Sequence, residues 1–142
     1  MAIGCLARGQ ASAPVPGSAC ALLIRARAVL DEAAVAESAA ERFRLAHVAA
    51  LRTAAAVFAE RGRPTGSRRR IVSAWVLVTS VAPELGEWAA YFAAAAPLRA
   101  AVEAGAVSAV HERDADDQLR AAAEFLQLVE ASLGLLPAAL AS

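Results

Sequence analysis

The segment between Ser38 and Gly62 constrains the fold more than any other part of the chain. It is rich in alanine, and its apolar residues recur every three or four positions, which is the period of an α-helix with one buried face. Alanine has the highest helix propensity and a very small side chain, so it favours helices that approach one another closely. The buried face is expected to consist of Phe43, His47, Ala50, Leu51, Ala54 and Phe58.

Both ends of this helix carry sequence signals. The run Ser38-Ala-Ala-Glu41 matches a capping box, in which the serine oxygen accepts a hydrogen bond from a free backbone N–H and the glutamate reaches back. It marks either the start of a second helix or a kink in a longer one. At the other end, Gly62 and Pro64 break the helix.

The rest of the chain repeats the helical pattern. A first helix is expected to begin after Ser18, and a third near Arg70. Pro83 and Pro97 each begin a further segment, because proline fits the first turn of a helix but not its interior. Neither the alternation typical of strands nor an internal repeat is present. The sequence predicts an all-α fold, a bundle of four long helical segments plus one short helix. The last helix has the clearest stripe: Leu119, Ala122, Phe125, Leu126, Val129 and Leu133.

The periodicity also suggests where the domain lies. Residues 1–17 lack it and contain Gly, Pro and Ser, so they are expected to form a mobile tail, with a single domain over 18–136 and a C-terminal tail over 137–142. A chain of 142 residues is long enough to bury a core. No apolar run reaches the ~18 residues that a membrane span needs, and no signal peptide is apparent, so we expect a cytoplasmic protein.

Composition excludes several functions. Lysine is absent, and fourteen arginines balance fourteen acidic residues, so a whole-protein role such as coating nucleic acid is not expected. The two cysteines, Cys5 and Cys20, make neither a disulfide framework nor a metal site, and we predict reduced thiols. No phosphate-binding loop, nucleophile signature or pair of catalytic carboxylates is found. We therefore expect no cofactor and no metal.

Arg42 and His47 are the one pair for which catalysis can be argued from residue types. A histidine can act as general base or acid on a ribose hydroxyl while an arginine stabilises the phosphate, which would permit RNA cleavage without a metal. Five residues along a helix turn the side chains about 140° apart, however. His47 also lies on the apolar face, which favours a role in the core.

A second candidate site is a group of arginines around the loop that follows this helix. Arginine forks match phosphate oxygens, so the group is a candidate anion or RNA site; the alternative is a solvated loop in which the first two arginines stabilise a helix C-terminus. No aromatic residues interleave with them, as single-strand binding would favour. The residues are Arg61, Arg63, Arg68, Arg69 and Arg70.

A third candidate is an acidic cluster next to His111. Its spacing does not match known zinc or calcium loops, whereas acids in the first turn of a helix are favoured by the helix dipole. These acids could also pair with the arginine loop, within one chain or across a dimer. The cluster comprises Glu112, Asp114, Asp116 and Asp117.

Several short blocks, in order along the chain, resemble the HEPN superfamily, and particularly its actinobacterial SAV-type branch. The resemblance spans residues 22–131 and rests on more than one block. The blocks are Arg42-Phe-Arg-Leu-Ala-His47 with its alanine-rich continuation, Arg63-Pro64, Ser73-Ala-Trp75, residues 82–92, and Ala115-Asp-Asp117-Gln-Leu-Arg120.

The resemblance implies an up-and-down helical bundle that is often homodimeric. Many members of the superfamily are metal-independent RNases with an R-x4-6-H motif, while others bind nucleotides or partner proteins. We expect a homodimeric, non-catalytic module that binds RNA, a nucleotide or a partner protein. The alternative is a metal-independent endoribonuclease, related to toxin–antitoxin systems, with His47 as general base or acid and Arg42 on the scissile phosphate. A third hypothesis is structural packing without a ligand.

Overall fold

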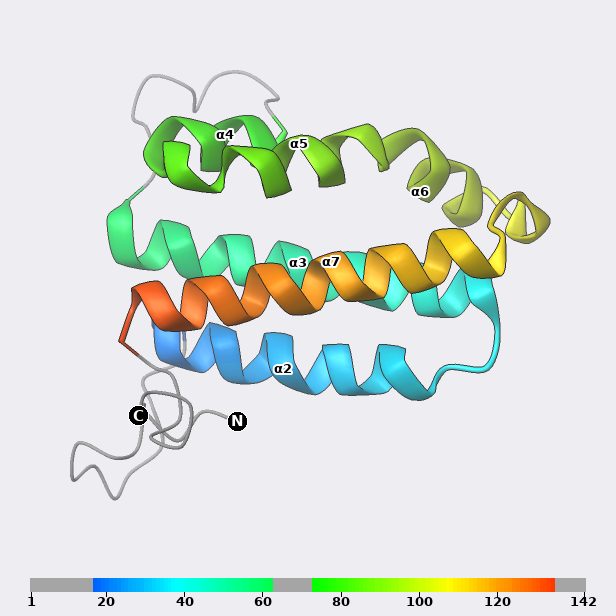
Figure 1. Ribbon diagram of the computed structural model, residues 1–142, viewed down its shortest axis with the longest axis horizontal. Helices are drawn as coiled ribbons and strands as arrows, with labels where there is room; N and C mark the ends of the chain where they lie inside the picture. Colours follow the sequence, from blue (N-terminus) through cyan, green and yellow to red (C-terminus); the bar gives the residue numbers. More distant parts are fainter. Residues whose placement is uncertain (1–16, 63–72, 135–142) are drawn as a thin grey trace.

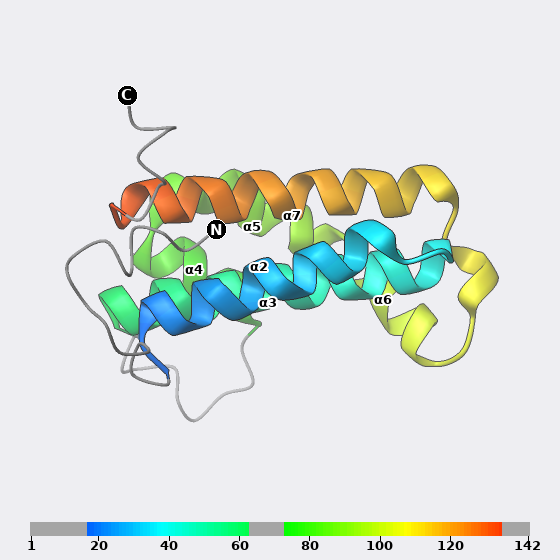
Figure 2. The ribbon, with the colours of Figure 1, turned by 90° about the horizontal axis from the view of Figure 1, so that it is seen from below.

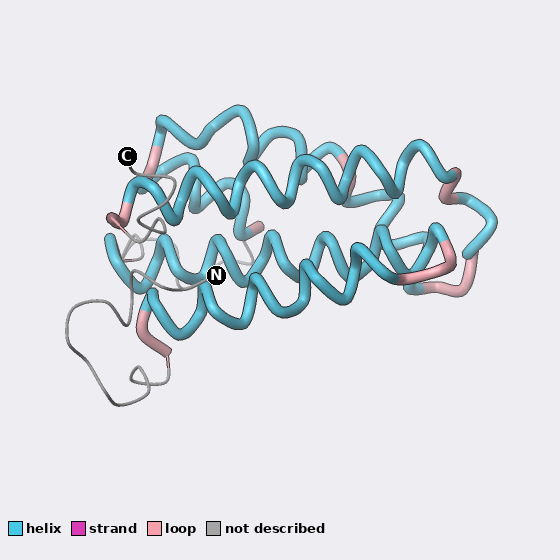
Figure 3. The backbone as a smooth tube through the Cα atoms, turned by 60° about the horizontal axis from the view of Figure 1, so that its bottom comes forward, coloured by secondary structure: helices cyan, strands magenta, loops and turns pink. Residues whose placement is uncertain are grey.

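The computed structural model describes residues 17–62 and 73–134, and all regular elements in these ranges are helices (Figure 3). Three helices are long: α2 (Ala19–Val35), α3 (Ala39–Arg61) and α7 (Glu112–Ser132). On a further side, α4 (Ala74–Val81), α5 (Gly86–Ala94) and α6 (Ala96–Glu103) follow one another (Figure 1). Successive sides of the bundle run in opposite directions, so the predicted all-α, up-and-down bundle is confirmed.

The described residues form three long and three short helices, whereas four long segments and one short helix were expected, because α4 and α5 are only eight and nine residues long. Pro83 begins a 3₁₀ turn, η2 (Pro83–Leu85), and Pro97 lies in the first turn of α6. A proline lacks the N–H that would continue the preceding helix, so each one starts a new segment. A second 3₁₀ turn, η3 (Val107–Ala109), precedes α7.

Serine residues cap the N-termini of α2, α3 and α4. The hydroxyl oxygens of Ser18, Ser38 and Ser73 each accept a hydrogen bond from the backbone N–H three residues later, at 3.1, 3.0 and 3.2 Å. Ser38 therefore starts a new helix and does not mark a kink. Glu41 does not complete the capping box, because its carboxylate binds Arg44 at 2.8 and 3.0 Å.

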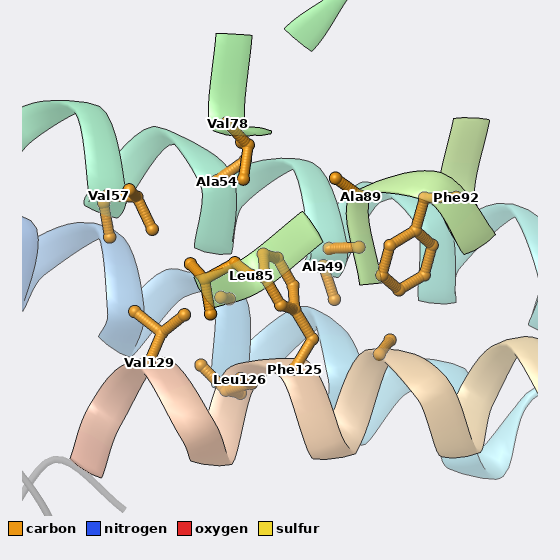
Figure 4. Packing of buried hydrophobic residues seen from close by; sticks show 14 of the residues in the cluster. Ala49, Ala54, Val57, Val78, Leu85, Ala89, Phe92, Phe125, Leu126 and Val129 are labelled. Atoms are coloured by element: carbon orange, nitrogen blue, oxygen red, sulfur yellow. The ribbon is translucent and has the colours of Figure 1, made fainter. Parts of the chain in front are cut away.

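The core lies where α3 meets the other helices (Figure 4), and α3 runs alongside α2 (Figure 2). Six of the eleven buried residues of α3 are alanine, and α3 makes its most extensive contacts with α2 and α7. Larger rings join α4 and α5 to α7: the centroids of Trp75 and Phe92 are 4.8 Å apart, and Phe125 lies 5.9 and 5.7 Å from them. Trp88 is only partly buried and packs against the edge of this core.

An ion pair connects α2 to α7 inside the bundle. The Nη2 atom of Arg27 lies 2.7 Å from Oε1 of Glu130, whose side chain is only 4% exposed. A buried carboxylate requires such a partner, because an uncompensated charge in a low-dielectric interior is strongly unfavourable. This ion pair holds the C-terminal half of α7 against α2.

Three further predictions concern the tails, the cysteines and the absence of a membrane-spanning segment. Apart from residue 17, the expected tails lie outside the described residues, and the single-domain boundary stays a prediction. Cys20 is disulfide-bonded, so the prediction of a reduced thiol there is wrong. The spacing of two cysteines does not reveal whether their sulfurs meet, because that depends on the backbone path between them. No helix in the described ranges has the length and apolar character needed to cross a membrane.

Candidate functional site

Arg42 joins the beginning of α3 to the beginning of α7. Its Nη1 atom donates to Glu112 at 2.8 Å and to Asp116 at 3.3 Å. Its Nη2 atom donates to the carbonyl oxygens of Ala36 and Glu37, at 3.1 and 3.3 Å, in the connection between α2 and α3. The hydrogen bond with Glu112 raises the pKa of Arg42. The guanidinium is thus engaged with three segments of the bundle.

His47 lies in the core, as its place on the apolar face of the helix predicts. Its relative exposure is 2%, and its ring meets those of Trp75 and Phe92 edge-on, with centroids 5.9 and 6.2 Å apart. Its Nδ1 atom lies 3.3 Å from the side-chain nitrogen of Gln118 on α7. The ring is therefore surrounded by aromatic and amide groups of three other helices.

Burial also determines the protonation of His47. It lowers the pKa of the imidazole to about 4, with a further contribution from the positive charge of Arg99. The ring is neutral at physiological pH, so Nδ1 can accept a hydrogen bond from the Gln118 amide. The neighbouring Nε2 then carries the ring proton.

The structure does not bring Arg42 and His47 together on one exposed surface. Arg42 binds carboxylates and carbonyls at the helix ends, whereas His47 faces the aromatic core. No hydrogen-bond partner is shared between the two side chains in the contacts described above. Their roles as a catalytic pair stay a prediction.

The arginine loop can be followed only at its beginning. Arg61, in the last turn of α3, forms an ion pair with Glu84 at 2.6 Å and donates to the carbonyl of Val81 at 3.4 Å. This arginine therefore holds the end of α3 against the junction between α4 and α5. The other predicted anion-binding residues, Arg63, Arg68, Arg69 and Arg70, lie outside the described residues, and their role stays a prediction.

The acidic cluster at the start of α7 is divided among separate partners. Two of its acids hold Arg42, and Asp114 accepts a hydrogen bond from the backbone N–H of His111 at 3.0 Å, which caps the helix. Asp117 pairs with Arg120 at 2.9 Å. Among the residues that the structure describes, no group of three or more His, Cys, Asp or Glu side chains is arranged to hold a metal ion.

Two adjoining hollows lie between α5–α6 and α7, and we call them together the α5–α7 groove. The first has a volume of about 340 Å³ and the second about 240 Å³, and Tyr91 and Asp117 line both. The first is also lined by Glu87, Trp88, Arg120, Ala121 and Glu124, and the second by Phe43, Ala94, Ala95, Leu98, Asp114 and Gln118.

The lining of this groove combines negative charge with aromatic surface. Four carboxylates line it, those of Glu87, Asp114, Asp117 and Glu124, against the single guanidinium of Arg120. Burial, followed by the charge of Asp117, raises the pKa of Tyr91, so its phenol is neutral at physiological pH. Such a surface attracts cationic groups and repels phosphates.

Gln118 connects the groove to the core. It is fully buried, it lines the second hollow, and its side-chain nitrogen is directed to His47. Its Oε1 atom finds no hydrogen-bond partner in the described part of the chain. A buried amide oxygen without a donor is unfavourable, and an N–H group that entered the second hollow could satisfy it.

Sequence reasoning did not identify this groove, although helical spacing contains a signal for it. Asp114, Asp117, Ala121 and Glu124 recur at intervals of three, four and three, so they share one face of α7. Glu87, Tyr91, Ala94 and Leu98 show the same kind of spacing on the opposite wall. The signal was missed because these faces are mixed in polarity, and neither reads as an apolar stripe.

Comparison with known families agrees with this helical architecture. The family model SAV_6107-like HEPN matches residues 33–130, which is more than half of the chain. The chain therefore belongs to the SAV_6107-like HEPN family, and the resemblance stated from the sequence is confirmed. Searches of curated proteins and of solved structures gave no match.

Proposed function

We propose that this HEPN domain is a non-catalytic binding module that recognises a partner protein. The main support is the placement of Arg42 and His47: the arginine is engaged in holding helix ends together, and the histidine is buried and neutral. General acid–base catalysis needs a side chain within reach of the substrate and a pKa near the working pH. The enclosure of His47 and the lowering of its pKa to about 4 disfavour this role.

The solvent-facing feature that supports binding is the α5–α7 groove. Its carboxylates disfavour the phosphates of RNA or of a nucleotide at this surface, whereas its aromatic rings and hollows suit a protein segment. Among the three ligands expected from the sequence, a partner protein therefore fits this groove best. Homodimer formation and a cytoplasmic location stay predictions of the sequence.

A metal-independent ribonuclease is the second candidate, because the chain belongs to a HEPN family and has the R-x4-H spacing at Arg42 and His47. In that case both side chains would have to open into one cleft, for example in another assembly of the protein. In such a conformation Arg42 would lose its contacts with α7, and His47 would become exposed.

An RNA cleavage assay in the presence of a chelator tests the proposal. The wild-type protein is compared with Arg42→Gln and His47→Gln, and with Arg113→Gln as a matched control at an exposed position of α7. We expect all four proteins to leave the RNA intact. Circular dichroism establishes that each variant is folded.

The proposal would be overturned if the wild type and Arg113→Gln cleaved the RNA at equal rates while folded Arg42→Gln and His47→Gln did not cleave it. Cleavage by all four proteins at one rate would instead indicate a contaminating nuclease, because it would be independent of the candidate pair.

A further inference from the structure

We infer that the α5–α7 groove binds an arginine-containing segment of a partner protein, and that the arginine side chain occupies the hollow lined by Gln118 and Asp117. The inference rests on the proposed function, since it specifies the chemistry of the partner. It depends on four observations: the charge of the groove, the unpartnered amide oxygen, the composition of the walls, and the length of the groove.

Charge is the first observation. Carboxylates outnumber the guanidinium in the groove by four to one, although the whole chain has no net charge. Asp114 and Asp117 both line the second hollow, one turn apart on α7. Each uses only part of its acceptor capacity within the described structure, because a carboxylate has about four lone-pair sites. This hollow therefore favours a cation with several N–H donors.

The amide of Gln118 is the second observation and is independent of the charges. Its Oε1 atom lacks a donor, while its side-chain nitrogen is directed to the neutral ring of His47. Since His47 holds the amide in this orientation, the oxygen stays available for a donor from outside the core. An arginine has five N–H groups, so it can reach this oxygen and a carboxylate together.

The walls of the hollow are the third observation. Phe43 and Leu98 provide apolar surface for the aliphatic stem of an arginine, and Tyr91 provides a ring on which a planar guanidinium can stack. Gln118 is covered in the free protein, so side chains around the hollow must rotate as the ligand enters. Tyr91 is 39% exposed and has the freedom to do so.

The fourth observation distinguishes a protein segment from a small molecule. The hollows follow α7 from Asp114 to Glu124, and ten residues of helix span about 15 Å. An extended peptide covers that distance with about five residues. The remaining carboxylates, Glu87 and Glu124, would then lie beside the flanking residues of the segment, where further basic residues are favoured.

Calorimetric titration of the full chain with the blocked peptide Ala-Ala-Arg-Ala-Ala tests the inference. Matched peptides carry citrulline, which has nearly the shape of arginine without its charge, or lysine, which has the charge without the planar fork. We expect the arginine peptide to bind, the citrulline peptide to bind at least about tenfold more weakly, and the lysine peptide to be intermediate.

Protein variants locate the binding. Asp117→Asn is expected to weaken binding of the arginine peptide about tenfold, and Gln118→Met to weaken it by a similar factor. Asp31→Asn makes the same change of charge at an exposed position of α2, outside the groove, and should leave the affinity unchanged. Since Gln118→Met also removes the contact with His47, the surface variant Asp117→Asn provides a test that does not depend on the core.

Three results would overturn the inference: equal binding of the citrulline peptide, equal weakening by Asp31→Asn and Asp117→Asn, or displacement of the arginine peptide by single-stranded RNA. Each is separate from the cleavage assay. If the RNA stays intact and the peptide does not bind, the arginine site is rejected while the proposed non-catalytic function stands. If cleavage depends on Arg42 and His47 and the peptide binds, the non-catalytic function is rejected while the arginine site stands.

Discussion

Helix α7 contacts α3 and α5 in different ways. Its contact with α3 is extensive, and most of the buried residues of α3 are small. Its contact with α5 is made by large rings, because Phe125 of α7 packs against Phe92 of α5. The distance between packed helices depends on the size of the side chains at the contact. The alanine-rich side therefore closes tightly, and the aromatic side leaves the α5–α7 groove along its edge.

The buried polar groups around α7 differ in kind. Between α2 and α7, Arg27 pairs with Glu130, while the Nε atom of Arg27 has no hydrogen-bond partner in the described part of the chain. Within α3, the hydroxyl of Thr53 donates to the carbonyl of Ala49 at 2.9 Å. Beside the groove, the atom without a partner is an acceptor, the Oε1 atom of Gln118, and it lies next to carboxylates. The groove side therefore favours a ligand that carries N–H donors.

The largest expected effect comes from removing the ring that separates α5 from α7. Phe125→Ala should lower the free energy of unfolding by about 3–5 kcal/mol, because the cavity cannot be refilled by the surrounding rings. Chemical denaturation measures the change. Leu128→Ala, at a partly exposed position of the same helix, is the control and should cost less than about 1 kcal/mol. Equal losses in the two variants would show that the aromatic side does not depend on Phe125.

The next effect concerns the histidine behind the groove. Its folded pKa of about 4 is below its ordinary value of 6.5, so between these values the unfolded chain binds a proton that the folded protein does not. The free energy of unfolding should therefore fall as the pH is lowered from 6.5 to about 4, by at most about 3 kcal/mol.

Denaturation at a series of pH values measures this slope in the wild type and two variants. His47→Gln should flatten it, whereas His111→Gln, which alters an exposed histidine, should keep it. A slope that persists unchanged in folded His47→Gln would contradict the neutral state assigned to the buried ring.

A pair of alanine substitutions compares the closed side with the groove directly. Ala46 in α3 is fully buried, and Ala46→Leu should lower the free energy of unfolding by about 1–3 kcal/mol, because the added carbons force helices apart. Ala94→Leu makes the same change at an exposed position lining the groove and should stay within about 0.5 kcal/mol. Thermal unfolding followed by circular dichroism compares them, and similar losses would mean that the two sides are equally tightly packed.

The smallest effect is expected for a groove carboxylate. The pair of Asp117 with Arg120 is exposed, with 46% and 64% of the side chains accessible, so Asp117→Asn should change stability by less than about 1 kcal/mol. The same substitution is predicted to weaken arginine-peptide binding. A large loss of stability would assign Asp117 to the fold instead of to recognition.

Local signals in the sequence predicted much of this fold. The caps at Ser18 and Ser38, the breaks at Pro83 and Pro97, and the burial of His47 follow from helix period and backbone chemistry, and all are present. These features depend on residues within a few positions of one another. The carboxylate partners of Arg42 and the arginine partner of Glu130 could not be predicted in this way, since they lie 70 or more positions away along the chain.

The sequence by itself determined that the chain forms amphipathic helices with His47 on an apolar face, and its short blocks identified the HEPN family. Only the tertiary structure decided that Arg42 holds the ends of three helices and that small and large side chains meet α7 on different sides. It also decided that a groove opens beside Gln118. The physical reason is that helix period acts within one segment, whereas the spacing between helices depends on side chains brought together from distant parts of the chain.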